Sequence, residues 1–265
     1  MKVMGIVNVT PDSFSDGGLY LDARRAIEHG RELAAAGADV LDIGGESTRP
    51  GADPVGAAEE IARVIPVVEG LAGVAPISID TSKAEVAASA IEAGASTVND
   101  VTALDGDPEM ASVCADSGVE VILMHMLGEP GTMQRDPRYE DPVGEIREFL
   151  LSRVEAACEA GVSRDRVWID PGIGFGKTLE HNIELLRGTR RFAETGLPVL
   201  VGPSRKAFIG RIDGSAEAGR LGGTIAACLA AADGGAAMVR VHDVAPVVQA
   251  LRVRDRISGS VDSSG

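Results

Sequence analysis

Residues 75–101, APISIDTSKAEVAASAIEAGASTVNDV, contain the unit that decides the fold. A short apolar run over 75–80 ends on Asp80, and a second run over 96–100 has Asn99 near its end. Short runs rich in Val and Ile, without polar alternation, are typical of parallel strands buried on both faces. The stretch therefore predicts two parallel strands joined by a crossover helix.

Helical patterns separate such runs along the whole chain. Ser82, followed three residues later by Glu85, predicts a capping box at the start of the helix within the quoted stretch. Apolar residues also recur at helical spacing over 57–71 and 143–160, so each segment is expected to bury one face.

Eight apolar runs alternate with these helical segments. They cover 3–9, 39–43, 75–80, 96–100, 119–124, 167–170, 198–202 and 237–241. Eight strand–helix units in this length predict a single (β/α)8 barrel over 1–257, followed by a disordered tail over 258–265. An open, doubly wound sheet is the alternative.

The composition limits the possible partners. The 265 residues carry a net charge of −15, and only four of the 25 basic residues are lysines: Lys2, Lys83, Lys177 and Lys206. Such a charge repels nucleic acid and anionic membrane surfaces, so neither is an expected partner. Much of the acidic excess, such as Glu59 and Glu60, falls in predicted helices. An anionic substrate would therefore need a local cationic pocket.

The cysteines and the first residues indicate the compartment. Cys114, Cys158 and Cys228 are far apart in alanine-rich segments, without the spacing of a metal knuckle or redox pair. We expect buried thiols in a reducing cytoplasm. The chain begins directly with an apolar strand, so no export signal is expected.

A barrel predicts where the chemistry lies, because catalytic residues of this fold follow the carboxyl ends of the strands. Polar or ionisable residues occupy nearly all of these positions: Asn8, Asp42, Asp80, Asn99-Asp100, Met124-His125, Asp170, Ser204-Arg205-Lys206, Arg240 and His242. Alternation alone does not decide which of Asn99 and Asp100 faces the site.

The glycine-rich segment 172–178, GIGFGKT, is similar to a phosphate-binding loop but is one residue too short before Gly-Lys-Thr. It is expected to be a turn over the barrel mouth that presents Phe175 to a flat ligand. The spacing of the four histidines fits no zinc motif.

Cationic residues from distant segments converge on the same predicted face. They are Arg49, Lys206 and Arg240, with His242 beside them. Cations suit a phosphate group, whereas the carboxylates and amides suit a heterocycle with donor and acceptor edges. The segments 10–18 and 47–51 are expected to be mobile or gating loops.

Eight separated motifs resemble those of the dihydropteroate synthase family, in order and at predicted strand ends. They are GIVNVTPDSFSDGG (5–18), GGESTRPG (44–51), SIDT (78–81), VNDV (98–101), LMHMLGEPGTMQ (123–134), DPGIGFGK (170–177), GPSRK (202–206) and RVHDV (240–244). The resemblance implies condensation of 6-hydroxymethyl-7,8-dihydropterin diphosphate with 4-aminobenzoate, giving dihydropteroate and diphosphate.

The resemblance also implies residue roles. The pterin ring would be held by Asp80, Asn99, Met124, Asp170, Gly202 and Lys206. The diphosphate would be held by Asn8, Thr48, Arg240 and His242, with Mg²⁺ as cofactor nearest Asn8. Aminobenzoate would bind Arg49, Pro50, Phe175 and Ser204.

The implied mechanism is largely dissociative, with diphosphate leaving before the amine attacks. Lys206, Arg240 and His242 would be catalytic with Asp42, which together with Asp16 would place negative charge near the pterin cation. Sulfonamides are expected to compete with aminobenzoate. Two departures from the family pattern stand out: Pro203, which lacks an amide donor, and Ala103-Leu104, where glycines are frequent and the loop is expected to be stiffer.

Two other functions share part of this pattern. A corrinoid-dependent methyltransferase would need Asp80, Asn99 and Asp170 but not Arg49 or the Ser-Arg-Lys run. A non-catalytic pterin-binding relative would have a damaged diphosphate site, and none is visible. The alanine- and glycine-rich segment 216–233 suits a homodimer interface or, equally, helices packed on a barrel.

Overall fold

The computed structural model describes residues 1–9, 18–47, 54–129 and 131–259. Eight parallel strands pair in the order β6-β5-β4-β3-β2-β1-β8-β7. They are β1 (Lys2–Asn8), β2 (Val40–Gly44), β3 (Ile77–Asp80), β4 (Thr97–Asp100), β5 (Glu120–Met124), β6 (Val167–Asp170), β7 (Leu200–Val201) and β8 (Met238–Val241). A parallel bridge between Ile169 and Val199 joins the two edges. The predicted (β/α)8 barrel is confirmed, and the open doubly wound sheet is wrong.

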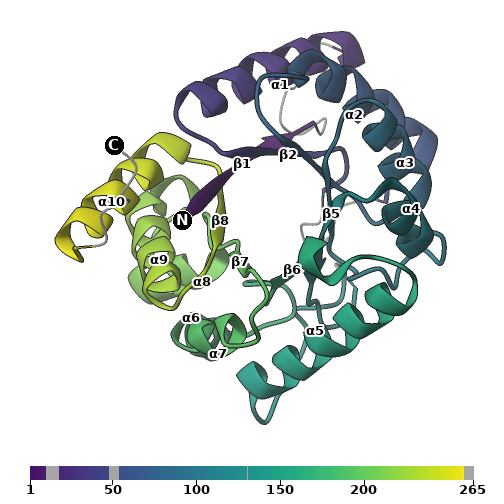
Figure 1. Ribbon diagram of the computed structural model, residues 1–265. Coiled ribbons are helices and arrows are strands. Elements are labelled where there is room, and N and C mark those ends of the chain that lie inside the picture. Colours follow the sequence, from purple (N-terminus) through teal and green to yellow (C-terminus); the bar gives the residue numbers. More distant parts are fainter. Residues whose placement is uncertain (10–17, 48–53, 130, 260–265) are drawn as a thin grey trace.

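Helices form a ring around the strands (Figure 1). They are α1 (Gly18–Ala35), α2 (Ala57–Leu71), α3 (Ala84–Glu92), α4 (Met110–Ser117), α5 (Pro142–Glu159), α6 (Leu179–Arg187), α7 (Thr189–Ala193), α8 (Ala207–Asp213), α9 (Leu221–Asp233) and α10 (Val244–Ile257). The two helices expected from periodicity are α2 and α5. In α2 the predicted stripe is buried at Val64, Val68 and Leu71, which confirms the face that packs inward.

Helix α3 begins differently from the prediction. Its N-cap is Lys83, and no side chain caps it. The amide of Ala84 instead donates to Asp107 Oδ2 at 2.9 Å, a carboxylate from the loop after β4. The Ser82–Glu85 capping box is therefore wrong, because a residue distant in sequence satisfies the free amide.

Strand positions agree with the sequence to within two residues, but β7 contains only Leu200–Val201 of the predicted 198–202. Its pairing with β6 consists of the single bridge at Val199. The barrel therefore closes at its least regular seam, beside the Ser204-Arg205-Lys206 run.

The inside of the barrel is apolar toward the amino ends of the strands, here called its floor, and more polar toward their carboxyl ends. A cluster of strand residues fills the lower part: Met4, Val40, Ile122, Trp168, Leu200 and Met238. Because strand side chains alternate between faces, the residues two positions further along also point inward. Those positions hold Ile6, Asp42, Met124, Asp170, Gly202 and Arg240, three of them charged. The candidate site is therefore the polar layer directly above the apolar floor.

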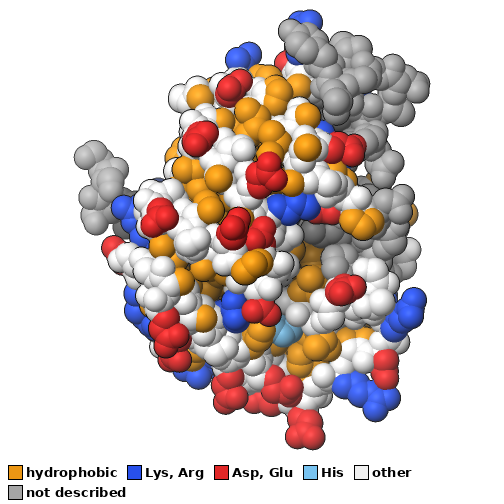
Figure 2. Space-filling view, turned by 90° about the vertical axis from the view of Figure 1, so that its right-hand side faces the viewer, with side chains coloured by type: hydrophobic (Ala, Val, Ile, Leu, Met, Phe, Trp, Pro, Cys, Tyr) orange, Lys and Arg blue, Asp and Glu red, His pale blue; other side chains and the backbone are white. Residues whose placement is uncertain are grey.

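Acidic side chains are scattered over the face of the molecule that Figure 2 shows. Glu60 differs from the expectation for this surface. It is fully buried and pairs with Lys83 at 2.6 Å, so part of the acidic excess is internal.

Neither disulfides nor membrane helices are seen in the described part of the chain. The three cysteines have free thiols, with Cys114 and Cys228 buried as expected and Cys158 only half-buried. Among the helices of the described ranges, none combines the length and apolar character needed to cross a bilayer.

Candidate active site

A cavity of about 750 Å³ opens at the carboxyl ends of the strands. Its walls include most of the strand-end residues expected from the sequence: Asn8, Asp80, Asn99, Met124, Asp170, Phe175, Gly202, Ser204, Lys206, Arg240 and His242. Residues from six strands and the loops that follow them therefore share one mouth, as the barrel rule predicts.

Arg240 is held between two carboxylates in this cavity. Its Nε donates to Asp42 Oδ2 at 2.5 Å, and its Nη2 donates to Asp80 Oδ2 at 2.6 Å. Burial opposes the charge, but Asp42 and Asp80 overcome that cost and raise the pKa of Arg240 above its ordinary value. Arg240 is therefore a permanent, rigidly oriented cation.

For Asp80, the effect of burial on the pKa outweighs the attraction of the neighbouring charge. Burial raises the pKa of its carboxyl to about 7, against the attraction of Arg240, and the nearby Asp42 adds to the rise. Two carboxylates share one guanidinium, so the group of Asp42, Asp80 and Arg240 has a net negative charge only above about pH 7, where Asp80 is ionised.

Asp42 does not line the cavity but lies beneath it, fully buried. Its Oδ2 also accepts from Asn99 Nδ2 at 3.1 Å. Its Oδ1 has no hydrogen-bond partner among the described residues. A buried carboxylate with a free oxygen can stabilise positive charge that develops above it.

Of the two polar residues at the end of β4, Asn99 faces the cavity. Asp100 points away, where its oxygens accept from the amides of Thr102 and Leu104 at 2.8 and 2.9 Å. Ala103 and Leu104 adopt left-handed backbone angles, with φ of 54° and 62°. The loop thus keeps a shape that glycine adopts more easily, and Asp100 holds it there.

Asp170 lies at the end of β6, where Gly172 N donates to its Oδ1 at 2.7 Å. Burial raises the pKa of this carboxyl to about 6, although Gly172, Lys206 and Lys177 all favour its ionised form. Asp170 is therefore ionised at neutral pH and ready to accept hydrogen bonds from a ligand.

Lys206 and Phe175 meet at the edge of the mouth. Lys206 Nζ lies 4.0 Å from the centre of the Phe175 ring, within cation–π range. Gly174, with φ of +85°, makes this approach possible, because a Cβ there would lie 2.9 Å from Lys206 Cδ. The glycine-rich turn thus presents Phe175 to the cavity, beside a lysine from the loop after β7.

Ser204 and His242 join the last two strand-end loops. Ser204 Oγ lies 2.9 Å from His242 Nδ1 and accepts from His242 N at 3.1 Å. Burial, together with Arg240 and Arg205, lowers the pKa of His242 to about 3. His242 is therefore a neutral hydrogen-bonding group. The positive charge among the described cavity residues comes from basic side chains: Lys206, Arg205, Arg211, Arg220, Arg240 and the buried Lys177.

The residues predicted for the site and the residues that line the cavity are not the same set. Thr48, Arg49, Pro50 and Asp16 lie outside the described residues, as do most of the two expected gating loops. Cavity residues to which the sequence assigned no role include Glu46, Gln134, Asn182, Arg211, Arg220 and Lys177. Lys177 belongs to the quoted glycine-rich motif, and its only signal was a lysine next to a turn of small residues.

The oxygen donors fit a weakly held divalent cation. Within the described ranges, His, Cys, Asp and Glu form no group of three that could hold a metal. Asn8 lines the cavity, and its side-chain amide contains one acceptor oxygen. Mg²⁺ is commonly bound by one or two protein oxygens together with substrate phosphates. Asn8 is compatible with that arrangement.

Comparison with known proteins identifies the family. Residues 4–242 match the pterin binding enzyme family. A dihydropteroate synthase of Synechocystis is 47% identical over 258 residues, covering 96% of this chain and 89% of the relative. A dihydropteroate synthase of Xanthomonas albilineans, solved with 4-aminobenzoic acid, is 49% identical with a TM-score of 0.92, covering 98% of this chain and 94% of that chain.

Two further structures carry other ligands. The Xanthomonas albilineans enzyme in complex with 7,8-dihydropteroate has a TM-score of 0.89 at 46% identity, with coverage of 98% and 94%. A Yersinia pestis dihydropteroate synthase in a sulfonamide drug complex has a TM-score of 0.92 at 42% identity, with coverage of 97% and 94%. The chain described above belongs to the pterin binding enzymes, as a member of the dihydropteroate synthases.

Proposed function

We propose that this chain condenses 6-hydroxymethyl-7,8-dihydropterin diphosphate with 4-aminobenzoate to give 7,8-dihydropteroate in folate biosynthesis. The observation that carries the proposal is the composition of the cavity wall. Two carboxylates and an amide, from Asp80, Asp170 and Asn99, line it together with the cations Arg240 and Lys206. The relatives found in complex with 4-aminobenzoic acid and with 7,8-dihydropteroate support the same reaction.

The layer of side chains directly above the apolar floor of the barrel would hold the pterin ring. Asp80, Asn99 and Asp170 offer acceptors and a donor at three points of the wall. Met124 supplies an apolar surface beside them, and Lys206 adds a cationic donor. Gly202 lines the cavity without a side chain, which leaves room for a flat heterocycle.

The diphosphate would bind between Arg240, His242, Asn8 and Thr48. Arg240 has a planar fork suited to phosphate oxygens, and neutral His242 can donate a hydrogen bond. Asn8 would be the residue nearest Mg²⁺. When bound, Mg²⁺ would neutralise charge on the departing diphosphate.

The reaction would proceed by largely dissociative substitution. The carbon–oxygen bond to diphosphate breaks, and its electron pair leaves with the diphosphate. The amine nitrogen of aminobenzoate then forms the new carbon–nitrogen bond and loses a proton. The buried charge of Asp42, with its unpartnered Oδ1, lies where it can stabilise the intermediate cation.

Aminobenzoate would bind beside Phe175 and Ser204, with Arg49 and Pro50 of the 47–51 loop. Ser204 is buried at the mouth and Phe175 faces the cavity. Because a sulfonamide has the shape of aminobenzoate, it would compete for the same subsite. The sulfonamide complex of the Yersinia pestis relative supports this proposal.

The decisive assay measures diphosphate release. Purified protein with the pterin diphosphate and Mg²⁺ should release diphosphate in step with dihydropteroate formation, and only when 4-aminobenzoate is present. Transfer of a methyl group to a corrinoid would instead assign the chain to the rival methyltransferase class. Binding of pterin without turnover would indicate the non-catalytic alternative.

We also propose a homodimer in the cytoplasm. The free thiols of the three cysteines suit a reducing compartment.

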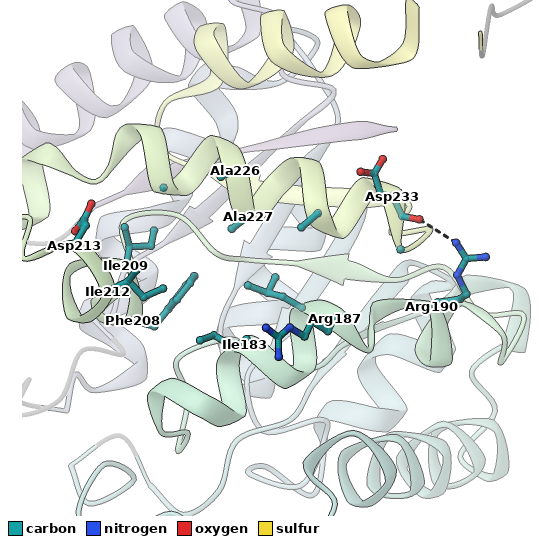
Figure 3. Close-up of a pocket in the computed structure, with 14 residues that line it drawn as sticks. Ile183, Arg187, Arg190, Phe208, Ile209, Ile212, Asp213, Ala226, Ala227 and Asp233 are labelled. Atoms are coloured by element: carbon teal, nitrogen blue, oxygen red, sulfur yellow. Dashed lines mark hydrogen bonds between the residues drawn. The ribbon is translucent and has the colours of Figure 1, made fainter. Parts of the chain in front are cut away.

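A groove between α6, α8 and α9 offers a candidate interface for the homodimer (Figure 3). Phe208, Ile209 and Ile212 of α8 line it opposite Ala226 and Ala227 of α9. Helix α9 also packs Cys228 and Ala231 against the barrel, so its small residues fit both alternatives considered for the sequence.

Ile212→Asp should convert this dimer to a monomer, because Ile212 is 62% exposed at the groove and a charge there would be buried on association. Analytical ultracentrifugation measures the mass. Val253→Asp on α10 is the matched control, since Val253 is 54% exposed and does not line the groove. A monomeric parent protein, or a dimer that survives Ile212→Asp, would contradict this interface.

A further inference from the structure

Lys177 is a buried amine with no place in the roles assigned so far. Only 1% of its surface is exposed, although lysine is seldom fully buried. Its Nζ lies 2.8 Å from the carbonyl oxygen of Phe175 and 3.3 Å from that of His125. The third neighbour is His125 Nδ1 at 3.1 Å. Three acceptors match the three protons of an ammonium group.

These contacts join two strand-end loops. His125 follows β5, whereas Phe175 and Lys177 follow β6. The loops touch directly at Gly172, which has φ of +68° and where a Cβ would lie 2.0 Å from the His125 carbonyl oxygen. Lys177 therefore ties the glycine-rich turn to its neighbour where the two backbones pack closely against each other.

The surroundings keep His125 neutral, which leaves one ring nitrogen free to accept a hydrogen bond from Lys177. Burial, and then the charge of Lys177, lowers the pKa of His125 to about 3, so the ring is neutral near pH 7. Phe149 packs edge-on against the ring, with centroids 4.9 Å apart. Tyr139 lies beside it and donates its hydroxyl to the carbonyl of Gly176 at 3.1 Å. The imidazole thus has a fixed orientation.

The charge of Lys177 is costly, and the nearby Asp170 offsets part of that cost. Burial lowers the pKa of Lys177 to about 7, Asp170 acts in the opposite direction, and Lys206 adds repulsion. A group held at such a cost, among the residues that line the cavity, is more useful for holding the cavity wall in place than for stabilising the fold.

We propose that Lys177 is a positioning residue that locks the Gly172–Phe175 turn through the Phe175 carbonyl and so fixes the Phe175 ring at the aminobenzoate subsite. The inference rests on the proposed function, because it uses the assignment of Phe175 to that subsite. Lys177 acts through the backbone of Phe175 and need not touch either substrate. Its loss should therefore affect one substrate more than the other.

Lys177→Met keeps a long side chain and removes all three donors. We expect the KM for aminobenzoate to rise about tenfold or more, the loss typical of hydrogen bonds from a charged donor, with a smaller change in the KM for the pterin diphosphate. Lys2→Met is the matched control, because Lys2 lies at the opposite end of the barrel, 5.5 Å from the Trp168 ring centre. This control should leave both KM values unchanged.

A second measurement needs no variant. The chain has four histidines, so the ring nitrogens of His125 can be followed by NMR in the whole protein. We expect a neutral ring with a bare Nδ1 and a proton on Nε2 at about pH 5 to about pH 6, where the Lys177 amine, with its pKa lowered to about 7, still carries its proton. In a folded Lys177→Met protein, the Nδ1 signal should shift. The His125 signals of the parent protein can still be measured if Lys177→Met does not fold.

The outcomes separate the two proposals. If the parent protein makes no dihydropteroate, the proposed function fails, whereas the NMR measurement still tests the lysine–imidazole contact. If the parent is active but Lys177→Met changes both KM values equally, or neither, the positioning role is wrong. A proton on Nδ1 of His125 in the parent protein would also overturn it.

Discussion

Replacing Arg240 by alanine is expected to weaken binding of the pterin diphosphate by about 100-fold or more, while binding of the free pterin falls much less. Two charge-assisted hydrogen bonds to phosphate, each worth roughly 1.5–3 kcal/mol, account for a loss of this size. Arg240 is already held by Asp42 and Asp80 at 2.5 and 2.6 Å. Little side-chain entropy is therefore lost when it binds the ligand.

Calorimetry with both ligands measures the difference between the two losses. Arg240→Lys should be intermediate, because lysine keeps the charge but loses the planar fork. Arg138→Ala is the control, since Arg138 is exposed and its ion pair with Asp136 lies on the surface. Equal losses for the two ligands would show that the diphosphate binds elsewhere.

Asp170→Asn is expected to have a comparable effect on the pterin itself. An ionised carboxylate accepts hydrogen bonds from ring N–H groups, whereas an amide in its place offers only one acceptor oxygen. Hydrogen bonds to a buried charged partner support a loss of about 10- to 100-fold in pterin affinity. Gly172 would also lose its charged acceptor, now 2.7 Å away.

The pH dependence of pterin binding follows from the same groups. The pKa of Asp170 is raised to about 6 and that of Asp80 to about 7, both chiefly by burial. Above these values both carboxylates are ionised and accept hydrogen bonds. As the pH falls through about 7 and then about 6, each gains a proton and affinity declines.

Asp170→Asn should remove the lower of the two steps from this profile. Calorimetric titrations of the parent and variant proteins between about pH 5 and about pH 8.5 measure it. Throughout that range His242 remains neutral, because its pKa is lowered to about 3 by burial and nearby cations. A pterin affinity that does not change with pH would contradict the use of these two carboxylates.

The barrel could be predicted from the sequence because its parallel strands are buried on both faces. Residues 75–101 show the unit, and β3 and β4 lie within it as expected. The capping box at Ser82 failed, because Asp107 caps Ala84 from another loop. Local patterns do not reveal partners that come from distant parts of the chain.

The site was predictable where strand ends fix the position of a side chain. Asn99 and Asp100 could not be separated by alternation within β4 alone. Pairing of Asn99 with Asp80 on β3 sets the register and turns Asn99 inward. Lys177 was missed for a related reason, since its contact with His125 joins residues 52 apart. Neither contact leaves a signal in the local sequence.

The most direct test of the central claim is a crystal structure of this protein with the pterin diphosphate and an unreactive aminobenzoate analogue. The account predicts the pterin ring against Asp80, Asn99 and Asp170, the diphosphate on Arg240 and His242, and the analogue beside Phe175 and Ser204. A diphosphate bound away from Arg240, or a pterin ring outside the layer above the apolar barrel floor, would contradict it.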